Sequence, residues 1–299
     1  MFAGTPVAAA IVLRELVKSG MEIPVVITRP DAPVGRKRVL TQSAVAAEAL
    51  SLGIPVIKTL SVDAETQSRL IAERVQFGLI VAYGSILKQD ALECLPGGWY
   101  NLHYSLLPKY RGAAPVQHAL LSGDDTTGVT IFKLAPGIDT GDVLATLETQ
   151  ISPDENAGDL LTRLSILGST LLLQELPRLD GNQALAHQVG QASAAPKLTR
   201  DSSKVDFNSS AIQVHNLVRA CNPEPGAWCF VGEQTFKIHA TRAAADRGLT
   251  PGQVETEQGK VLVGCGTGSL ELIEVQPSGK NRMSAADWIR GLSRKPVLR

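Results

Sequence analysis

The feature that most constrains this chain is an alternation of strand-like and helix-like segments over roughly its first 145 residues. Short runs rich in β-branched residues occur at 24–28 (PVVIT), 78–82 (GLIVA) and 129–134 (VTIFKL). Helical periodicity occurs at 8–19, 43–52 and 64–76, and Gly20 and Gly53 follow two of these segments as expected C-caps. The alternation predicts a Rossmann-like α/β domain, with a mostly parallel sheet, helices on both faces and ligands at the carboxyl ends of the strands.

The second part of the chain has a different pattern. Residues 157–179 predict one more helix, and residues 181–207 are rich in Ala, Gln, Ser and Gly, as expected of a linker that crosses the first domain's surface. After a predicted helix near 210–221, short strands are expected at 228–231, 236–240, 252–255, 260–264 and 270–276. Their spacing indicates a small OB-like β-barrel. We therefore expect a first domain at 1–182, a linker at 183–203 and a barrel domain at 204–299.

Composition limits the classes of function. With 29 Lys and Arg against 29 Asp and Glu, the chain is not coated in basic charge, so contact with a polyanion must be local. Such a patch is expected near the end of the chain, where only Asp287 opposes the basic residues Lys280, Arg282, Arg290, Arg294, Lys295 and Arg299. The four cysteines form no CxxC pair, and we find neither a signal peptide nor a long apolar run; a cytoplasmic protein is expected.

Common cofactor motifs are missing. FAGTP at the start of the chain lacks a phosphate-binding glycine pattern, and GCGTGS at 264–269 lies between predicted strands, as a hairpin turn would. The five histidines are scattered without metal-ligand spacing, so we predict no metal site.

Asn101 and His103 are unusual because they lie two apart in a segment that otherwise predicts a buried strand. Residues at i and i+2 of a strand point to the same side. Asp139 follows the strand at 129–134 in a glycine-flanked turn, PGIDTGD. If the two strands are parallel neighbours, all three side chains meet at one edge of the sheet.

These three side chains can serve catalysis or only structure. A carboxylate beside an imidazole raises its pKa, and an adjacent amide donates a hydrogen bond, so the set can stabilise an oxyanion and move a proton. It contains no nucleophile, which fits a transfer in which the substrate's own amine attacks. On spacing alone, however, a hydrogen-bonded polar pair in the core is the more common explanation for Asn101 and His103.

The run NLHYSLLPKYRGAAPVQHALLSGDDTTGVTIFKLAPGIDTGD resembles the folate-dependent formyltransferases, and the resemblance extends over the whole chain. Five further segments share this resemblance: FAGTP, RPDAPVGRKR, VAYGSIL, NPEPGAW and QPSGKNRMSA. The resemblance implies transfer of the formyl group of 10-formyltetrahydrofolate to the amino group of methionine on initiator methionyl-tRNA, by direct attack of the amine through a tetrahedral intermediate.

The resemblance also implies roles for individual residues. Asn101 and His103 would polarise the formyl oxygen, and Asp139 would keep His103 charged and help to remove the proton from the amine. The folate co-substrate would be held by the loop of Ser105, Leu106, Leu107 and Pro108 and by Val81, Ala82, Tyr83 and Gly84. The transfer requires no metal.

The tRNA contacts are also implied by resemblance. The segment at 31–40 (DAPVGRKRVL) resembles the family's insertion loop, which enters the acceptor stem, so Arg36, Lys37 and Arg38 would contact tRNA. In the barrel domain, Lys280 and Arg282 are the expected phosphate contacts.

Two departures from the family pattern affect the expectations. The chain begins at MFAGTP, where relatives have several more residues of the first strand, so either this strand is short or the sequence omits its beginning. Tyr104 stands where relatives often have a small residue and is expected to narrow the pocket.

Two other functions stay open at this point. One is a different enzyme with the same catalytic domain, which formylates an amino sugar or hydrolyses formyl-folate. The other is an RNA-binding protein without catalytic activity. The basic segment at 36–38 favours tRNA over a sugar, and the Asn/His/Asp set favours an enzyme over a binding protein.

Overall fold

The computed structural model describes residues 1–35, 37–179 and 184–299, which form two compact units. Unit 1 comprises Met1–Pro115, Thr127–Thr149 and Leu161–Ala194; unit 2 comprises Val116–Thr126, Gln150–Leu160 and Ala195–Arg299. These units are defined by proximity in space and include segments from different parts of the chain, so the predicted boundaries at 182 and 203 remain a prediction.

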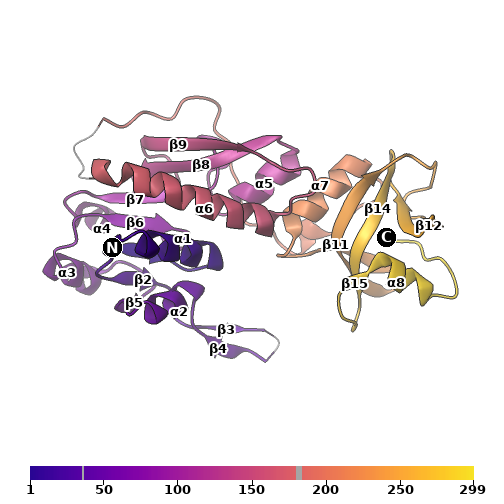
Figure 1. Cartoon of the computed structure of the whole chain (residues 1–299), viewed down its shortest axis with the longest axis horizontal. Helices are drawn as coiled ribbons and strands as arrows, with labels where there is room; N and C mark the ends of the chain where they lie inside the picture. Colours follow the sequence, from indigo (N-terminus) through magenta and orange to yellow (C-terminus); the bar gives the residue numbers. More distant parts are fainter. Residues whose placement is uncertain (36, 180–183) are drawn as a thin grey trace. The chain divides into compact units, whose positions relative to one another are not determined.

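A seven-stranded sheet forms the centre of unit 1, in the order β5-β2-β1-β6-β7-β8-β9 (Figure 1). Its strands are β1 (Phe2–Gly4), β2 (Val26–Thr28), β5 (Val56–Lys58), β6 (Gly78–Val81), β7 (Trp99–His103), β8 (Thr126–Lys133) and β9 (Val143–Gln150). The first five strands in this order, β5, β2, β1, β6 and β7, pair in parallel with their neighbours, which confirms the predicted mostly parallel sheet. The first strand is short, with three residues.

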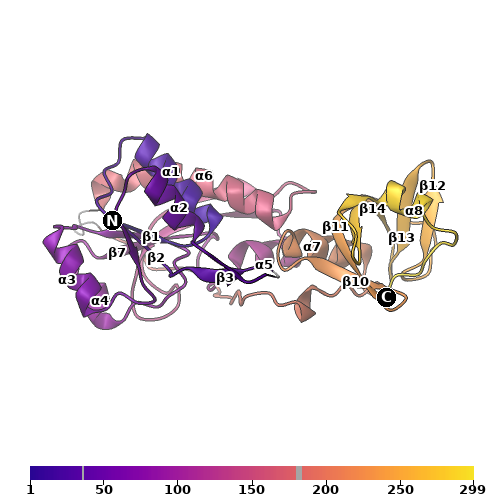
Figure 2. The same ribbon diagram turned by 90° about the horizontal axis from the view of Figure 1, so that it is seen from below.

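Helices cover both faces of this sheet, as predicted: Figure 2 shows α1, α2 and α6 on one side and α3 and α4 on the other. The helices are α1 (Val7–Lys18), α2 (Ala44–Ser51), α3 (Ala64–Ala72), α4 (Gln89–Glu93) and α6 (Ala157–Glu175), followed by the 3₁₀ turn η1 (Leu176–Arg178). The helix α5 (Pro115–Ser122) belongs almost entirely to a segment of unit 2. Ser43 and Asp63 cap α2 and α3 by accepting from Ala46 N and Thr66 N. Gly20 and Gly53 adopt positive φ after α1 and α2, so both predicted C-caps are confirmed.

One predicted strand relationship is wrong. β8 pairs antiparallel to β7, with His103 opposite Thr130 and Tyr100 opposite Lys133. The end of β8 therefore lies at the amino-terminal end of β7, away from His103. The residues after β8 must run back along the sheet to reach the carboxyl edge.

A small hairpin projects from unit 1 where the sequence predicted a loop. Its strands β3 (Ala32–Val34) and β4 (Val39–Thr41) pair only with each other, and every residue in them is exposed. Gly35 and Arg38 adopt left-handed conformations in the turn, at φ 71° and 50°. An isolated two-stranded hairpin without a packed face is only marginally stable.

Unit 2 contains the predicted antiparallel sheet, with β10-β11-β14-β13-β12 in order and β15 beside β14. Its elements are η2 (Asp201–Ser203), α7 (Ala211–Cys221), β10 (Ala227–Val231), β11 (Gln234–Ala244), β12 (Val254–Glu257), β13 (Lys260–Gly264), β14 (Ser269–Pro277), β15 (Met283–Ser284) and α8 (Ala285–Arg290). The GCGTGS segment is the β13–β14 turn, as predicted. Apolar side chains of α7, α8 and the strands form one core cluster.

The end of the chain joins the two edge strands of this sheet. Leu298 forms a bridge to Val231 of β10, and Val297 forms one to Gln253 next to β12. Because the tail pairs with both edges, the sheet closes on itself as a barrel would. Among the described residues, no helix is both long enough and apolar enough to span a membrane.

Candidate active site

Asn101 and His103 lie in the centre of the sheet, on β7, and their side chains share a face with Trp99 because strand residues alternate. The Oδ1 atom of Asn101 is buried and has no hydrogen-bond partner among the described residues. A buried amide that is not satisfied by the protein is rare in the interior of a fold. Asn101 is therefore not the hydrogen-bonded core residue that its spacing alone would favour.

Asp139 reaches His103 through a folded-back loop between β8 and β9. Its Oδ2 atom lies 3.7 Å from His103 Nδ1 and accepts a hydrogen bond of 2.7 Å from Gly112 N. Asp139 adopts a left-handed backbone conformation, with φ 51°. Such strain in a non-glycine residue persists only where the surroundings fix it, and it is common at functional sites. The three predicted catalytic residues thus share one edge of the sheet, although the predicted reason, two parallel strands, is wrong.

Burial and hydrogen bonding act on His103 in opposite directions. Burial lowers the pKa of this imidazole, while the Asp139 carboxylate and the hydrogen bond to Tyr110 O raise it; burial has the larger effect. Burial thus favours the neutral ring, whereas the resemblance implied that Asp139 keeps it charged, and that role of Asp139 stays a prediction. Because a carbonyl only accepts, Nε2 carries the proton donated to Tyr110 O over 2.9 Å. The lone pair of Nδ1 then faces Asp139.

The predicted folate loop continues directly from β7 and is held by internal hydrogen bonds. Ser105 Oγ donates to Lys109 O, and Thr130 of β8 accepts from Leu107 N while it donates to Ser105 O. The side chains of Ser105 and Leu107 are buried. These bonds fix the path of the loop, so the predicted contact with folate involves a rigid segment.

The second predicted folate segment lies where the order of the sheet reverses. After β1 the chain adds β2 and β5 on one side of it and then β6 and β7 on the other side. Open α/β sheets bind ligands at such a switch point. Thr5, after β1, donates to Tyr83 O, after β6. Ala82 and Gly84 are exposed with positive φ, whereas the Tyr83 ring is buried with its hydroxyl on Thr59 O.

Tyr104 does not narrow a pocket, contrary to expectation. It follows His103 directly and points to the opposite face of the sheet, where its hydroxyl bonds to Ser165 of α6 at 3.0 Å. Burial raises the pKa of this phenol above its ordinary range. Tyr104 therefore packs the sheet against α6.

The residues predicted to contact tRNA differ in their surroundings. Lys37 and Arg38 are exposed in the β3–β4 turn and, within the described residues, form no ion pair; Arg36 lies outside the described residues. Lys280 is exposed in the turn after β14, but Arg282 is paired with Glu274 through its Nε and Nη2 atoms. Arg290 and Lys295 are likewise paired, with Asp287 and Glu255. Part of the basic charge near the chain's end is thus neutralised by acidic side chains of β14, β12 and α8.

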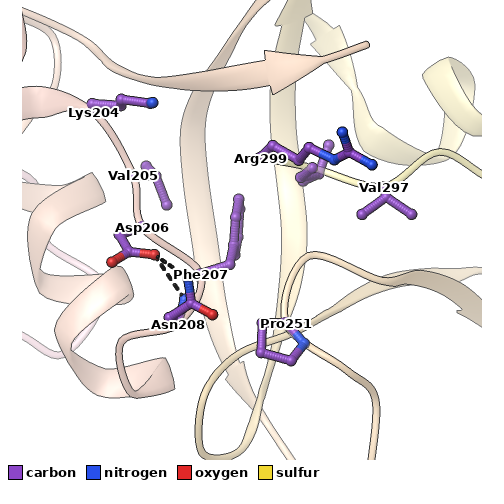
Figure 3. Close-up of a pocket in the computed structure, with 9 residues that line it drawn as sticks. Lys204, Val205, Asp206, Phe207, Asn208, Pro251, Val297 and Arg299 are labelled. Atoms are coloured by element: carbon purple, nitrogen blue, oxygen red, sulfur yellow. Dashed lines mark hydrogen bonds between the residues drawn. The ribbon is translucent and has the colours of Figure 1, made fainter.

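A hollow of about 500 Å³ lies in unit 2 and is separate from the predicted site residues (Figure 3). Lys204 and Arg299 lie on different sides of it, with the Phe207 ring between them in this view. The Lys204 ammonium also lies over the rings of Trp228 and Phe230. This basic and aromatic corner was not predicted from the sequence, because its members come from distant positions.

Several residues around the catalytic set also escaped sequence analysis. The Tyr110 carbonyl, the Gly112 N–H and the Gln188 amide act through backbone atoms or through contacts across long separations, so no motif marks them. No group of three His, Cys, Asp or Glu side chains suited to a metal occurs in the described part of the chain.

Comparison with known proteins gives matches over nearly the whole chain. The profile of the family described as formyl transferase matches residues 1–176, and that of the formyl transferase C-terminal domain matches 197–293. A methionyl-tRNA formyltransferase of Paenarthrobacter aurescens is 47% identical over 98% of this chain and 96% of its own length. A protein with that name from Clavibacter sepedonicus is 43% identical over 100% of this chain and 98% of its own.

Solved structures share the fold at lower sequence identity. An N-formyltransferase of Helicobacter canadensis, solved with folinic acid and dTDP-3-aminofucose, has a TM-score of 0.67 at 20% identity, covering 92% of this chain and 98% of its own. A methionyl-tRNA formyltransferase from Clostridium thermocellum has a TM-score of 0.59 at 14% identity, covering 92% of this chain and 96% of its own. Both profiles and the near full-length relatives agree: this chain belongs to the formyl transferase family.

Proposed function

We propose that this protein transfers the formyl group of 10-formyltetrahydrofolate to the amino group of methionine on initiator methionyl-tRNA, and so serves translation initiation. The observation that carries the proposal is the pairing of buried His103 with Asp139, 3.7 Å apart, beside an Asn101 amide oxygen without a partner among the described residues. The substrates are proposed from the names of relatives that are 41–47% identical over almost the whole chain.

The site fits a formyl donor and an amine because the buried Asn101 Oδ1, an acceptor, has no hydrogen-bond partner among the described residues and can accept from the attacking amine. A buried amide pays a desolvation penalty unless it meets a hydrogen-bonding group. Folate, when bound, supplies an activated formyl carbon and its oxygen. The Asn101 amide N–H can donate to that oxygen as negative charge develops on it, which is the stabilisation an acyl transfer requires.

His103 is arranged to accept the proton of the attacking amine. In the neutral ring, Nε2–H donates to Tyr110 O, and the Nδ1 lone pair is free to take a proton. The protonated ring then donates from both nitrogens, to Tyr110 O and toward Asp139, so both acceptors are used. Asp139 stabilises the charge that forms, and its own orientation is fixed by Gly112 N. The same proton can return to the departing folate nitrogen.

The β3–β4 hairpin supports the proposed RNA contact. Its turn carries Lys37 and Arg38, and large apolar side chains in it are exposed: Val34 to 57%, Val39 to 59% and Leu40 to 68%. Exposed apolar groups in an isolated hairpin are typical of a binding element. Basic residues beside them can contact phosphates while the apolar ones contact unpaired bases.

We further propose a cytoplasmic location. All four cysteines are free, and three of them are buried, as expected in a reducing compartment. Translation initiation, the proposed process, takes place there.

A sugar formyltransferase is the main alternative enzyme. The N-formyltransferase of Helicobacter canadensis, solved with dTDP-3-aminofucose, shares this fold. Fold similarity at 20% identity does not decide the substrate, however. The sequence relatives and the basic hairpin favour tRNA.

The substitution His103→Ala tests the catalytic assignment. It removes the proton acceptor, so formylation should fall by about 100-fold or more, the typical contribution of a general base. Binding of charged tRNA, measured by filter retention, should persist. His118→Ala is the matched control, because His118 bonds to Pro196 O, outside this site.

Formylation by His103→Ala at the wild-type rate would refute the role of His103. A wild-type protein that binds tRNA but never formylates it would instead favour a binding protein without catalytic activity.

A further inference from the structure

Residues 186–194 form an extended strap that contacts two loops of unit 1. At one end, Ala186 exchanges backbone hydrogen bonds with Val143, which follows the Asp139 loop. At the other end, Ser193 O accepts from Arg111 N, and Ser193 Oγ accepts from Tyr110 N at 2.9 Å. The strap therefore connects the loop that carries Asp139 with the loop that carries Tyr110.

Gln188 is the side chain in the strap that contacts both loops. Its Nε2 donates to Asp139 O at 2.9 Å and to Gly141 O at 2.8 Å. Its Oε1 accepts from Arg111, at 3.2 Å from Nε and 2.6 Å from Nη2. Both amide donors and the amide oxygen are thus used, and each bond ends on one of the two loops.

These bonds bear on the geometry of the catalytic pair. Asp139 has a strained φ of 51°, and a hydrogen bond to its carbonyl helps to hold that conformation. Arg111 lies between Tyr110, whose carbonyl orients His103, and Gly112, whose N–H orients Asp139. A shift of either loop would move His103 and Asp139 relative to each other.

We infer that Gln188 is a positioning residue, which fixes the Asp139 turn against the 110–112 segment and thereby sets the spacing of the Asp139–His103 pair. Gln188 does not contact either catalytic side chain through its own amide; it acts through the backbone carbonyls of Asp139 and Gly141 and through the Arg111 guanidinium. The inference rests on the proposed function, since it concerns the efficiency of that reaction.

The substitutions Gln188→Ala and Gln188→Glu test it. In Gln188→Ala the turn loses both donors, and kcat should fall by about 10- to 100-fold with the KM for tRNA little changed, because a small misplacement of catalytic groups has effects of this size. Val189→Ala is the control, since Val189 is 87% exposed and adjacent in sequence.

Gln188→Glu adds a readout that a merely structural residue would not give. Its carboxylate can still accept from Arg111, but its second oxygen would face the carbonyls of Asp139 and Gly141, which also only accept. Protonation removes this repulsion. The ratio of variant to wild-type kcat should therefore rise as pH falls.

A third readout does not require activity. The titration of the His103 imidazole, followed by NMR of the free protein, should shift in both Gln188 variants because the distance to Asp139 changes. Folded Gln188 variants with wild-type kcat and an unchanged His103 titration would overturn the inference, as would a reduced kcat in Gln188→Glu with a pH-independent ratio. Wild-type protein that lacks formyl transfer would overturn the proposed function instead.

Discussion

His103 is nearly removed from solvent, yet both of its ring nitrogens face oxygen acceptors. A neutral imidazole can donate to one acceptor only, so the free protein leaves the Nδ1 side unsatisfied. Nδ1 can therefore accept a proton from the attacking amine during the proposed reaction, and the protonated ring can then donate toward Asp139. Burial lowers the pKa of the ring, and the Asp139 carboxylate opposes this by stabilising the protonated form.

The charge state of His103 is open to direct measurement. Because burial lowers its pKa, the imidazole should titrate below its ordinary value of 6.5 in the free protein. The neutral ring therefore predominates at pH 7, and protonation occurs only as the pH falls further. NMR of ¹⁵N-labelled histidine resolves the titration, with His103→Ala to assign the signal.

Asp139→Asn sharpens this test, because it removes a charge that raises the pKa of His103. The midpoint should move further down in this variant. A midpoint above 6.5 in the wild type, or one that rises in Asp139→Asn, would contradict the assignment of a neutral proton acceptor.

For single residues, the sequence predicted which side chains lie in the site better than it predicted the environment of each side chain. The i, i+2 spacing of Asn101 and His103 was sufficient to place both on one face of a strand, and the glycine-flanked turn marked Asp139. The same alternation places Tyr104 on the opposite face from His103, but the contact with Ser165 of α6 joins distant segments and was not predicted. The lowering of the His103 pKa by burial could not be predicted from the sequence, because burial depends on the packing of distant segments.

Among the elements, the β3–β4 hairpin combines exposed apolar strands with a basic turn. On the proposed function, removing Lys37 and Arg38 together should raise the KM for tRNA without affecting folate binding. The dependence of log affinity on log salt should become shallower by about 1 for each phosphate that the variant no longer neutralises. Arg69→Ala on α3 is the control, as an exposed basic residue of unit 1 outside the hairpin.

Binding constants measured over a range of salt concentrations provide the comparison. An unchanged affinity and slope in Lys37→Ala/Arg38→Ala would exclude these two side chains from the RNA contact.

The closure of the barrel depends on Gly252. Its φ is 77°, and a Cβ atom there would lie 2.0 Å from Leu298 O, on the tail that joins the edge strands. Gly252→Ala should therefore lower the free energy of unfolding by about 3 kcal/mol or more, since backbone on both sides must shift. Urea denaturation monitored by tryptophan fluorescence measures the change.

The substitution Gly259→Ala is the control that distinguishes the cost of a left-handed backbone from the cost of a steric clash with the tail. Gly259 has a similar φ of 81°, but a Cβ atom would meet nothing within 4 Å. Its substitution should lower the free energy of unfolding by only about 1–2 kcal/mol, the typical penalty for a left-handed alanine. Equal losses in the two variants would contradict the role assigned to the tail.

Elements with a clear period were predicted from the sequence, and those defined by pairing partners were not. The helices of unit 1 and the strands of unit 2 follow local periodicity. The antiparallel direction of β8 and the pairing of residues 297–299 with two edge strands depend on register between distant segments, which local patterns do not encode. The sequence predicts a loop at 32–41 rather than a hairpin because Pro33, Gly35 and polar residues obscure its short strands.

For the whole molecule, each unit draws on segments separated in sequence. Unit 2 includes residues 116–126 and 150–160 from the first part of the chain, and buried Arg219 donates to the Ser152 carbonyl there. The domain boundaries predicted from the sequence stay a prediction beside this division into units. The linker's expected course over the first domain fits the contacts of residues 186–194 with unit 1.

The central claim concerns the whole protein: it formylates the methionine of one particular tRNA. The direct measurement is the rate of formyl transfer from 10-formyltetrahydrofolate to initiator methionyl-tRNA, with elongator methionyl-tRNA and a dTDP-amino sugar as competing acceptors. Rapid transfer to initiator tRNA, slow transfer to elongator tRNA and none to the sugar is the predicted result. Transfer to the amino sugar with no reaction on either tRNA would contradict it.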